Sequence, residues 1–81
     1  MNILQEAANI VDKDRGKIYG PAEVGFQRTA AMWSALLGVE VSAKQVCMCM
    51  IALKLQRLSV SPDHRDSLVD IVGYASLMEV V

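Results

Sequence analysis

The chain has 81 residues, enough for one domain and no more. Hydrophobic residues other than glycine make up 53% of it, above the roughly 45–50% that is usual for soluble domains even with glycine counted. Its formal net charge of −1 provides no positive field for duplex nucleic acid or a membrane surface. A domain this small cannot bury so much apolar surface alone. We therefore expect a homo-oligomer, either a dimer or a tetramer.

The spacing of apolar residues predicts one all-α domain over residues 1–81, with four helices and no strands. The first helix begins with Asn2 as its N-cap and Gln5 as its capping-box partner, and it ends in the charged run 12–16. The second covers about 21–37 and is followed by Gly38, a residue suited to a left-handed helix end. Its inner face is predicted to consist of Phe26, Ala30, Trp33 and Leu37.

The third helix has the clearest start in the sequence. Ser42 and Gln45 form a capping box, and Val41 and Val46 form a hydrophobic staple around it. Residues 46–55 are apolar nearly all round the helix, with Lys54 as the single interruption. Such a pattern predicts a central helix that is contacted on several sides.

The fourth helix follows a short turn over 59–62 and is predicted to run to the C-terminus. Either Asp63 or Ser61 is expected to be its N-cap. Gly73 within it indicates a close helix crossing, because glycine is otherwise costly in a helix interior. The third and fourth helices are predicted to form an antiparallel hairpin in a homo-oligomeric bundle.

That hairpin carries the first group of candidate site residues. Lys54 and Arg57 share one face of the third helix, and Asp66 and Asp70 share one face of the fourth, with Tyr74 continuing the line. The hairpin turn brings Arg57 level with Asp66, and Lys54 level with Asp70. One interpretation is two interhelical salt bridges. The other is a site in which the two cations bind a phosphate or a base.

Two further groups are candidates for binding an anion. Arg15, Lys17 and Tyr19 precede the second helix and could grip a phosphate at its N-terminus, or form a solvated turn beside the core. His64 and Arg65, at the start of the fourth helix, are either ordinary surface residues or part of an anion pocket across a subunit interface.

No complete catalytic set is found in the sequence. It has a single histidine, and neither a Ser-His-Asp arrangement nor a phosphate-binding glycine loop. Cys47 and Cys49 point to nearly opposite sides of a helix and cannot share a metal. They are predicted to be buried thiols in a reducing cytoplasm. We expect no catalytic residues, no metal site and no resident cofactor.

A signal peptide and a membrane span are not expected. Asn2, Gln5 and Glu6 interrupt the first apolar stretch. The longest apolar run, Val46–Leu53, is far shorter than the ~20 residues that cross a bilayer. A cytoplasmic location, without membrane partners, is therefore predicted.

Two groups of residues stand out as motifs: Arg15, Tyr19, Gly20, Phe26, Ala31 and Trp33 in the first half, and Lys54–Arg57 and His64–Ala75 in the second. Together they resemble a small domain family of unknown function that is common in phage genomes. The likeness covers nearly the whole chain, and the family implies no settled activity. If the chain is phage-encoded, its location would be the host cytoplasm.

The second half is also similar, more distantly, to the MazG-like all-α nucleotide pyrophosphohydrolases. In that family an ExxE pair on one helix and an ExxD pair on the next bind Mg²⁺ and a nucleoside triphosphate. Asp70 matches the last acid, but Ser67 occupies the position of its glutamate, with Asp66 one residue away. Lys54 and Arg57 stand where the first acidic pair would be, with the charge reversed.

This charge reversal suggests a binding protein rather than an enzyme. Lys and Arg can hold a phosphate directly, whereas carboxylates hold the Mg²⁺ that activates water. The leading hypothesis is a phage-type protein that sequesters a nucleotide without hydrolysis, for example a cyclic dinucleotide immune signal. The alternatives are a MazG-like hydrolase, which alone would need Mg²⁺, and a purely structural helical oligomer.

Overall fold

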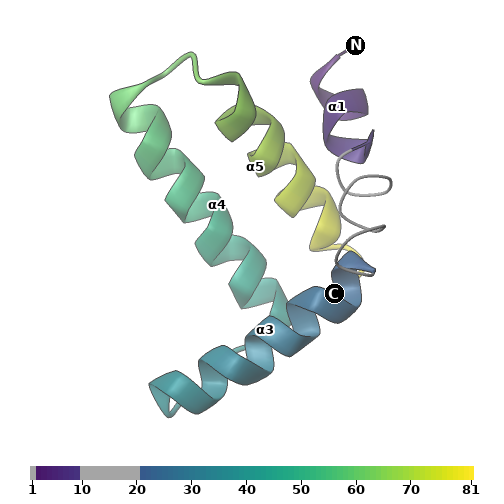
Figure 1. The fold of residues 1–81 in the computed structure, drawn as a ribbon, viewed down its shortest axis with the longest axis vertical. Coiled ribbons are helices and arrows are strands. Elements are labelled where there is room, and N and C mark those ends of the chain that lie inside the picture. The colour runs from purple at the N-terminus through teal and green to yellow at the C-terminus, as the bar shows by residue number, and fades with distance from the viewer. Residues whose placement is uncertain (1, 10–20) are drawn as a thin grey trace.

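The computed structural model describes residues 2–9 and 21–81, in which every regular element is a helix. The helices are α1 (Ile3–Asn9), α3 (Ala22–Leu37), α4 (Ala43–Val60) and α5 (Arg65–Leu77). Figure 1 shows α4 and α5 side by side and antiparallel. Helix α1 packs against α5, and α3 crosses α4 near its first residues, far from the turn that joins α4 to α5. The all-α prediction and the antiparallel hairpin are thus confirmed. None of the described helices is both long and apolar enough to cross a membrane.

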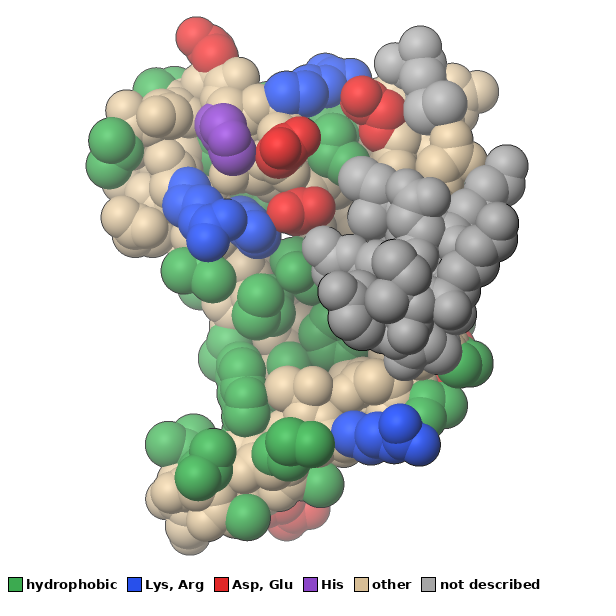
Figure 2. Space-filling view, viewed as in Figure 1, with side chains coloured by type: hydrophobic (Ala, Val, Ile, Leu, Met, Phe, Trp, Pro, Cys, Tyr) green, Lys and Arg blue, Asp and Glu red, His purple; other side chains and the backbone are tan. Residues whose placement is uncertain are grey.

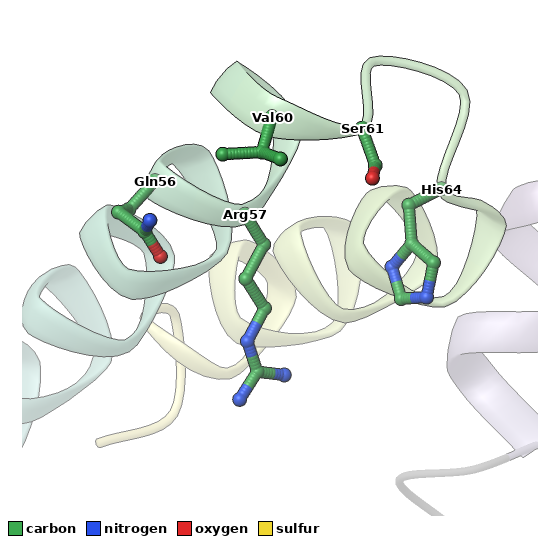
Figure 3. A pocket seen from close by; sticks show the side chains of 5 residues that line it. All are labelled: Gln56, Arg57, Val60, Ser61 and His64. Atoms are coloured by element: carbon green, nitrogen blue, oxygen red, sulfur yellow. The ribbon is translucent and has the colours of Figure 1, made fainter.

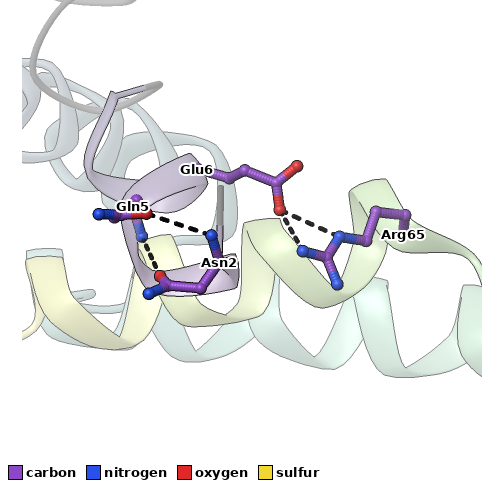
Figure 4. A network of polar contacts seen from close by, with 4 residues as sticks. All are labelled: Asn2, Gln5, Glu6 and Arg65. Atoms are coloured by element: carbon purple, nitrogen blue, oxygen red, sulfur yellow. Dashed lines mark hydrogen bonds and ion pairs between the residues drawn. The ribbon is translucent and has the colours of Figure 1, made fainter.

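Both capping boxes form as the sequence predicts. The Ser42 hydroxyl accepts a hydrogen bond from the Gln45 backbone N–H at 3.1 Å, and the Gln45 side chain accepts one from the Ser42 N–H at 2.9 Å. Asn2 and Gln5 exchange the same two bonds at the start of α1 (Figure 4). Each box satisfies N–H groups that have no partner within their helix. The predicted end of the first helix, 12–16, lies outside the described residues.

The ends of α3 fall close to their predicted positions. Pro21 occupies the N-cap position, so the helix begins one residue later than expected. Gly38 follows the helix with φ +71°, a left-handed conformation that costs glycine little and other residues more. The prediction of this helix end is therefore confirmed.

Both ends of α5 differ from the prediction. Because α4 continues to Val60, the connecting turn begins later than expected. The residue before α5 is His64, and no side chain caps the helix, so the expectation of Asp63 or Ser61 as cap is wrong. The helix ends at Leu77, and the remaining residues fold back through turns, so that Val81 packs against the core. The prediction that this helix runs to the last residue is therefore wrong.

The core lies where α3, α4 and α5 meet. Ala30 of α3 packs with Ala43 and Val46 of α4, and the Phe26, Trp33 and Val41 side chains cover them. A second cluster joins Cys47 of α4 to Tyr74 and Leu77 of α5. The rings of Phe26 and Tyr74 meet edge to face, with centroids 5.9 Å apart.

One serine hydroxyl ties the connection between α3 and α4 to the helix before it. The Ser34 Oγ accepts a hydrogen bond from the Val41 N–H at 2.8 Å. It donates to the carbonyl oxygen of Ala30, one turn earlier, at 2.7 Å. The start of α4 is therefore attached to the body of α3 by a side chain as well as by the backbone.

Two predictions about burial need correction. Leu37 was expected in the core, but α4 crosses α3 before its last turn, and Leu37 is exposed. The third helix was expected to be contacted on several sides, yet α3 and α5 cover only one side of α4. Met48, Leu53 and Leu55 on its other side are exposed. The sequence pattern is more apolar than the contacts within one chain require.

Candidate anion-binding pocket

One of the two predicted ion pairs between α4 and α5 is present. The Lys54 Nζ lies 3.1 Å from the Asp70 Oδ2, and both side chains are largely buried. Arg57 and Asp66, the other expected pair, form no ion pair in the part of the chain that the structure describes. Lys54 is therefore occupied in holding the hairpin together, whereas Arg57 extends from α4 as an exposed cation.

His64 is held in one orientation by a buried residue of α5. Its ring Nδ1 lies 2.7 Å from the hydroxyl of Ser67, which is 1% exposed. His64 is the N-cap residue of α5, and Ser67 lies three residues later in its first turn. Residues at this spacing lie on one face of a helix, so the imidazole ring is next to the serine hydroxyl. The hydrogen bond engages Nδ1 and leaves Nε2 to meet a ligand. If the serine donates the shared proton, Nε2 carries its own hydrogen and is a donor.

Arg57 and His64 line the same pocket. It has a volume of about 290 Å³ and is open to solvent at the end of the hairpin, with Gln56, Val60 and Ser61 completing its lining. Figure 3 shows the Arg57 and His64 side chains extending to the same side from α4 and from the start of α5. In Figure 2 charged side chains of both signs gather around the single histidine at this end of the molecule.

The chemistry of this pocket suits an anion of modest size. A guanidinium offers a planar fork of donors that matches phosphate or carboxylate. The N-terminus of α5, which no side chain caps, adds backbone N–H groups at the same end of the hairpin. The amide of Gln56 and the hydroxyl of Ser61 can both donate and accept hydrogen bonds.

Other candidate residues have structural partners. Arg65 binds Glu6 through Nε and Nη2, and so links α5 to α1 (Figure 4). Tyr74 is buried against Phe26. Asp66 is exposed in the first turn of α5 and does not line the pocket. Arg15, Lys17 and Tyr19 lie outside the described residues.

The cysteines differ from each other. Cys47 is fully buried, as expected, and its burial raises the pKa of its thiol. Cys49 was expected to be buried but is exposed, because it lies on the side of α4 that neither α3 nor α5 covers. Among residues 2–9 and 21–81, no three His, Cys, Asp or Glu side chains gather as metal ligands.

Sequence reasoning missed several of these contacts. The link between His64 and Ser67 had a local signal, a polar pair three residues apart at a helix start. The link between Glu6 and Arg65 had none, since the two residues are 59 positions apart. Gln56, Val60 and Ser61 gave no sign of a pocket, because its shape depends on where α4 ends.

Comparison with known proteins identifies relatives in phages. Residues 2–81 match the family model described as a domain of unknown function, DUF6378. The gene 55 protein of Mycobacterium phage L5 is 39% identical over 80 residues, which are 98% of this chain and 51% of that protein. The gene 55 protein of Mycobacterium phage D29 is 36% identical over 78 residues, 96% of this chain and 52% of its own length. The chain thus spans about half the length of these curated relatives. No solved structure matches it.

Proposed function

This chain belongs to the DUF6378 family, and we propose that it binds a nucleotide through its phosphate and sequesters it without hydrolysis. The observation that carries the proposal is that Arg57 and His64 line one solvent-open pocket, with the His64 ring oriented by its hydrogen bond to Ser67. Arg57 has no ion-pair partner among the described residues, so its charge is available to a ligand. With relatives in two phages, a nucleotide immune signal of the host, such as a cyclic dinucleotide, is the first ligand class to test.

The contacts of Asp70 support binding without hydrolysis. In a MazG-like enzyme the matching acid would help to hold Mg²⁺, which in turn activates water. Here the Asp70 carboxylate is paired with Lys54, and the neighbouring position is the uncharged, buried Ser67. Asp70 is engaged with Lys54 and Ser67 with His64, so the hairpin favours direct phosphate contact over metal-mediated chemistry. The assembly that we propose for this binder is a dimer or a tetramer.

A thermal-shift panel is the first experiment. The wild-type protein is heated with linear and cyclic nucleotides, each with and without Mg²⁺. A ligand at about 100 times its Kd stabilises the fold by about 2.7 kcal/mol. Stabilisation without metal is the expected result. Release of pyrophosphate or phosphate with Mg²⁺, abolished by Asp70→Asn, would replace the proposal with a hydrolase, and no response to any nucleotide would favour a structural role.

The pocket itself is tested by calorimetric titration with the nucleotide that the panel selects. We expect Arg57→Lys to weaken binding at least tenfold, about 1.4 kcal/mol, because lysine keeps the charge but lacks the bidentate fork. His64→Gln should also weaken binding. Arg28→Ala is the matched control, because Arg28 is an exposed arginine on α3 that does not line the pocket. Equal affinity in wild type, Arg57→Lys and His64→Gln would show that the site lies elsewhere.

A further inference from the structure

A regular row of uncharged residues runs along the uncovered side of α4, with apolar side chains at its centre and polar ones at its two ends. Its members are spaced by three, four, three and four residues, the repeat by which one helix packs against another in a coiled coil. All are exposed. We call this row the α4 seam, and it consists of Gln45, Met48, Ala52, Leu55 and Ser59.

The surface around the seam has few charges. Between Lys44 and Arg57 the exposed residues of α4 are all uncharged, because Lys54 is turned inward to Asp70. A second pocket of about 320 Å³ joins the start of the seam to the connection after α3, and its lining residues are Val39, Glu40, Val41, Gln45, Met48 and Cys49. A mainly apolar surface with one charge, that of Glu40, therefore continues from α4 towards the end of α3.

The last turns of α3 also carry exposed apolar residues. Met32 is 63% exposed and Leu36 is 82% exposed. On the seam itself, Met48 and Leu55 are 56% and 55% exposed. Figure 2 shows hydrophobic side chains over the recess between the end of α3 and the body of the molecule. Exposed apolar residues that gather in this way mark an interaction site more often than scattered ones do.

The chain exposes more surface than a compact monomer of its mass. Its accessible surface is 5514 Å², whereas a compact monomer of 8.9 kDa exposes about 4,800 Å². The whole chain therefore exposes about 700 Å² more than such a monomer, and a standard stable interface buries ~800 Å² of each partner.

We propose that a second copy of this chain covers the α4 seam in an antiparallel dimer whose two-fold axis passes beside Ala52. In this register Met48 of each copy packs against Leu55 of the other, and the two Ala52 methyl groups meet at the axis. The small Ala52 lets the helices approach closely at the centre, and the longer Met48 and Leu55 fill the space on either side. Gln45 and Ser59 supply the polar ends of the interface.

Sedimentation equilibrium tests the occupant of this surface. The wild type should sediment as twice 8.9 kDa at micromolar concentration, and Met48→Lys/Leu55→Lys should sediment as a monomer. Both substitutions are at exposed positions, so the helical circular dichroism should be unchanged. Leu4→Lys is the matched control, because Leu4 is an exposed apolar residue on α1, away from the seam, and this variant should stay dimeric.

A cysteine at the axis tests the register. In a Cys49→Ser background, Ala52→Cys places two thiols opposite each other, and mild oxidation should give a covalent dimer on a non-reducing gel. The control, Ser76→Cys in the same background, carries its thiol on the exposed side of α5 and should stay uncrosslinked.

Three results would overturn the proposal. A monomeric wild type would mean that a different partner, such as the remaining half of a longer relative, covers the seam. A dimer that withstands Met48→Lys/Leu55→Lys would have its interface elsewhere. A dimer that Ala52→Cys does not crosslink would have a different register. None of these results bears on the pocket of Arg57 and His64, which calorimetry tests separately.

Discussion

Ser67 is the residue that decides how His64 faces its pocket. Its hydroxyl is buried and bonded to the ring Nδ1, so that Nε2 is the nitrogen left for a ligand. A buried hydroxyl at this position therefore orients a hydrogen-bonding ring.

Burial gives Cys47 a prediction of its own. Its thiol is fully enclosed, and burial raises its pKa, so the reactive thiolate is scarcer at any given pH than it would be in an exposed cysteine. In a Cys49→Ser variant at pH 8, a thiol reagent should therefore modify Cys47 only as fast as the fold opens. The same variant in urea should react at once. Rapid modification of the folded protein would contradict the burial of Cys47.

At the scale of the elements, some features were predictable because their signals are local. The capping boxes of α1 and α4 depend on residues three apart, and both form. Gly38 ends α3 because glycine adopts the left-handed conformation of a helix end at little cost. The cap of α5 was mispredicted because Ser61 and Asp63 both fit the pattern, and only the point where α4 ends excludes them from the position.

Contacts between elements were only partly predictable. Counting back from the turn placed Lys54 opposite Asp70, and they pair, but the same count placed Arg57 opposite Asp66, and they do not. The exposure of Leu37 could not be foreseen, because periodicity gives the face of a helix and not the length over which a neighbour covers it.

The buried ion pair gives a prediction at this scale. Lys54→Met should lower the free energy of unfolding by about 3 kcal/mol, because it leaves the largely buried Asp70 carboxylate without its partner. The double variant Lys54→Met/Asp70→Leu should regain most of that loss, since it replaces the pair by apolar groups. Urea denaturation of the wild type, both single variants and the double variant measures the coupling.

The same variants distinguish the scaffold from the site. If Lys54 and Asp70 only hold the hairpin, the folded double variant should bind nucleotide as tightly as the wild type. If this variant is folded but no longer binds nucleotide, Lys54 and Asp70 are part of the ligand site.

At the scale of the whole molecule, the chain is rich in apolar residues that a single copy leaves exposed to solvent. The hydrophobic content is 53%, and several large apolar side chains, Met32, Leu36 and Leu55 among them, are exposed. The sequence pattern of α4 predicted contacts on several sides, whereas α3 and α5 cover only one side of it. A second copy at the α4 seam would satisfy the pattern that α3 and α5 leave unused.

Assembly should be visible in thermal stability. A dimer dissociates as it unfolds, so the wild-type Tm should rise with protein concentration. The Met48→Lys/Leu55→Lys variant should show a Tm that does not depend on concentration. Differential scanning fluorimetry over a hundredfold concentration range makes the comparison, and a wild-type Tm that stays constant would contradict the dimer.

The hydrogen bonds of Ser34 have a consequence for how two copies would meet. They fix the elbow between α3 and α4 within each chain, through the Val41 N–H and the Ala30 carbonyl oxygen. The recess beside the elbow is therefore preorganised, and little conformational entropy remains to be lost when a partner enters it. Association should then proceed as the docking of two rigid bodies, at the speed of diffusion and orientation rather than of folding.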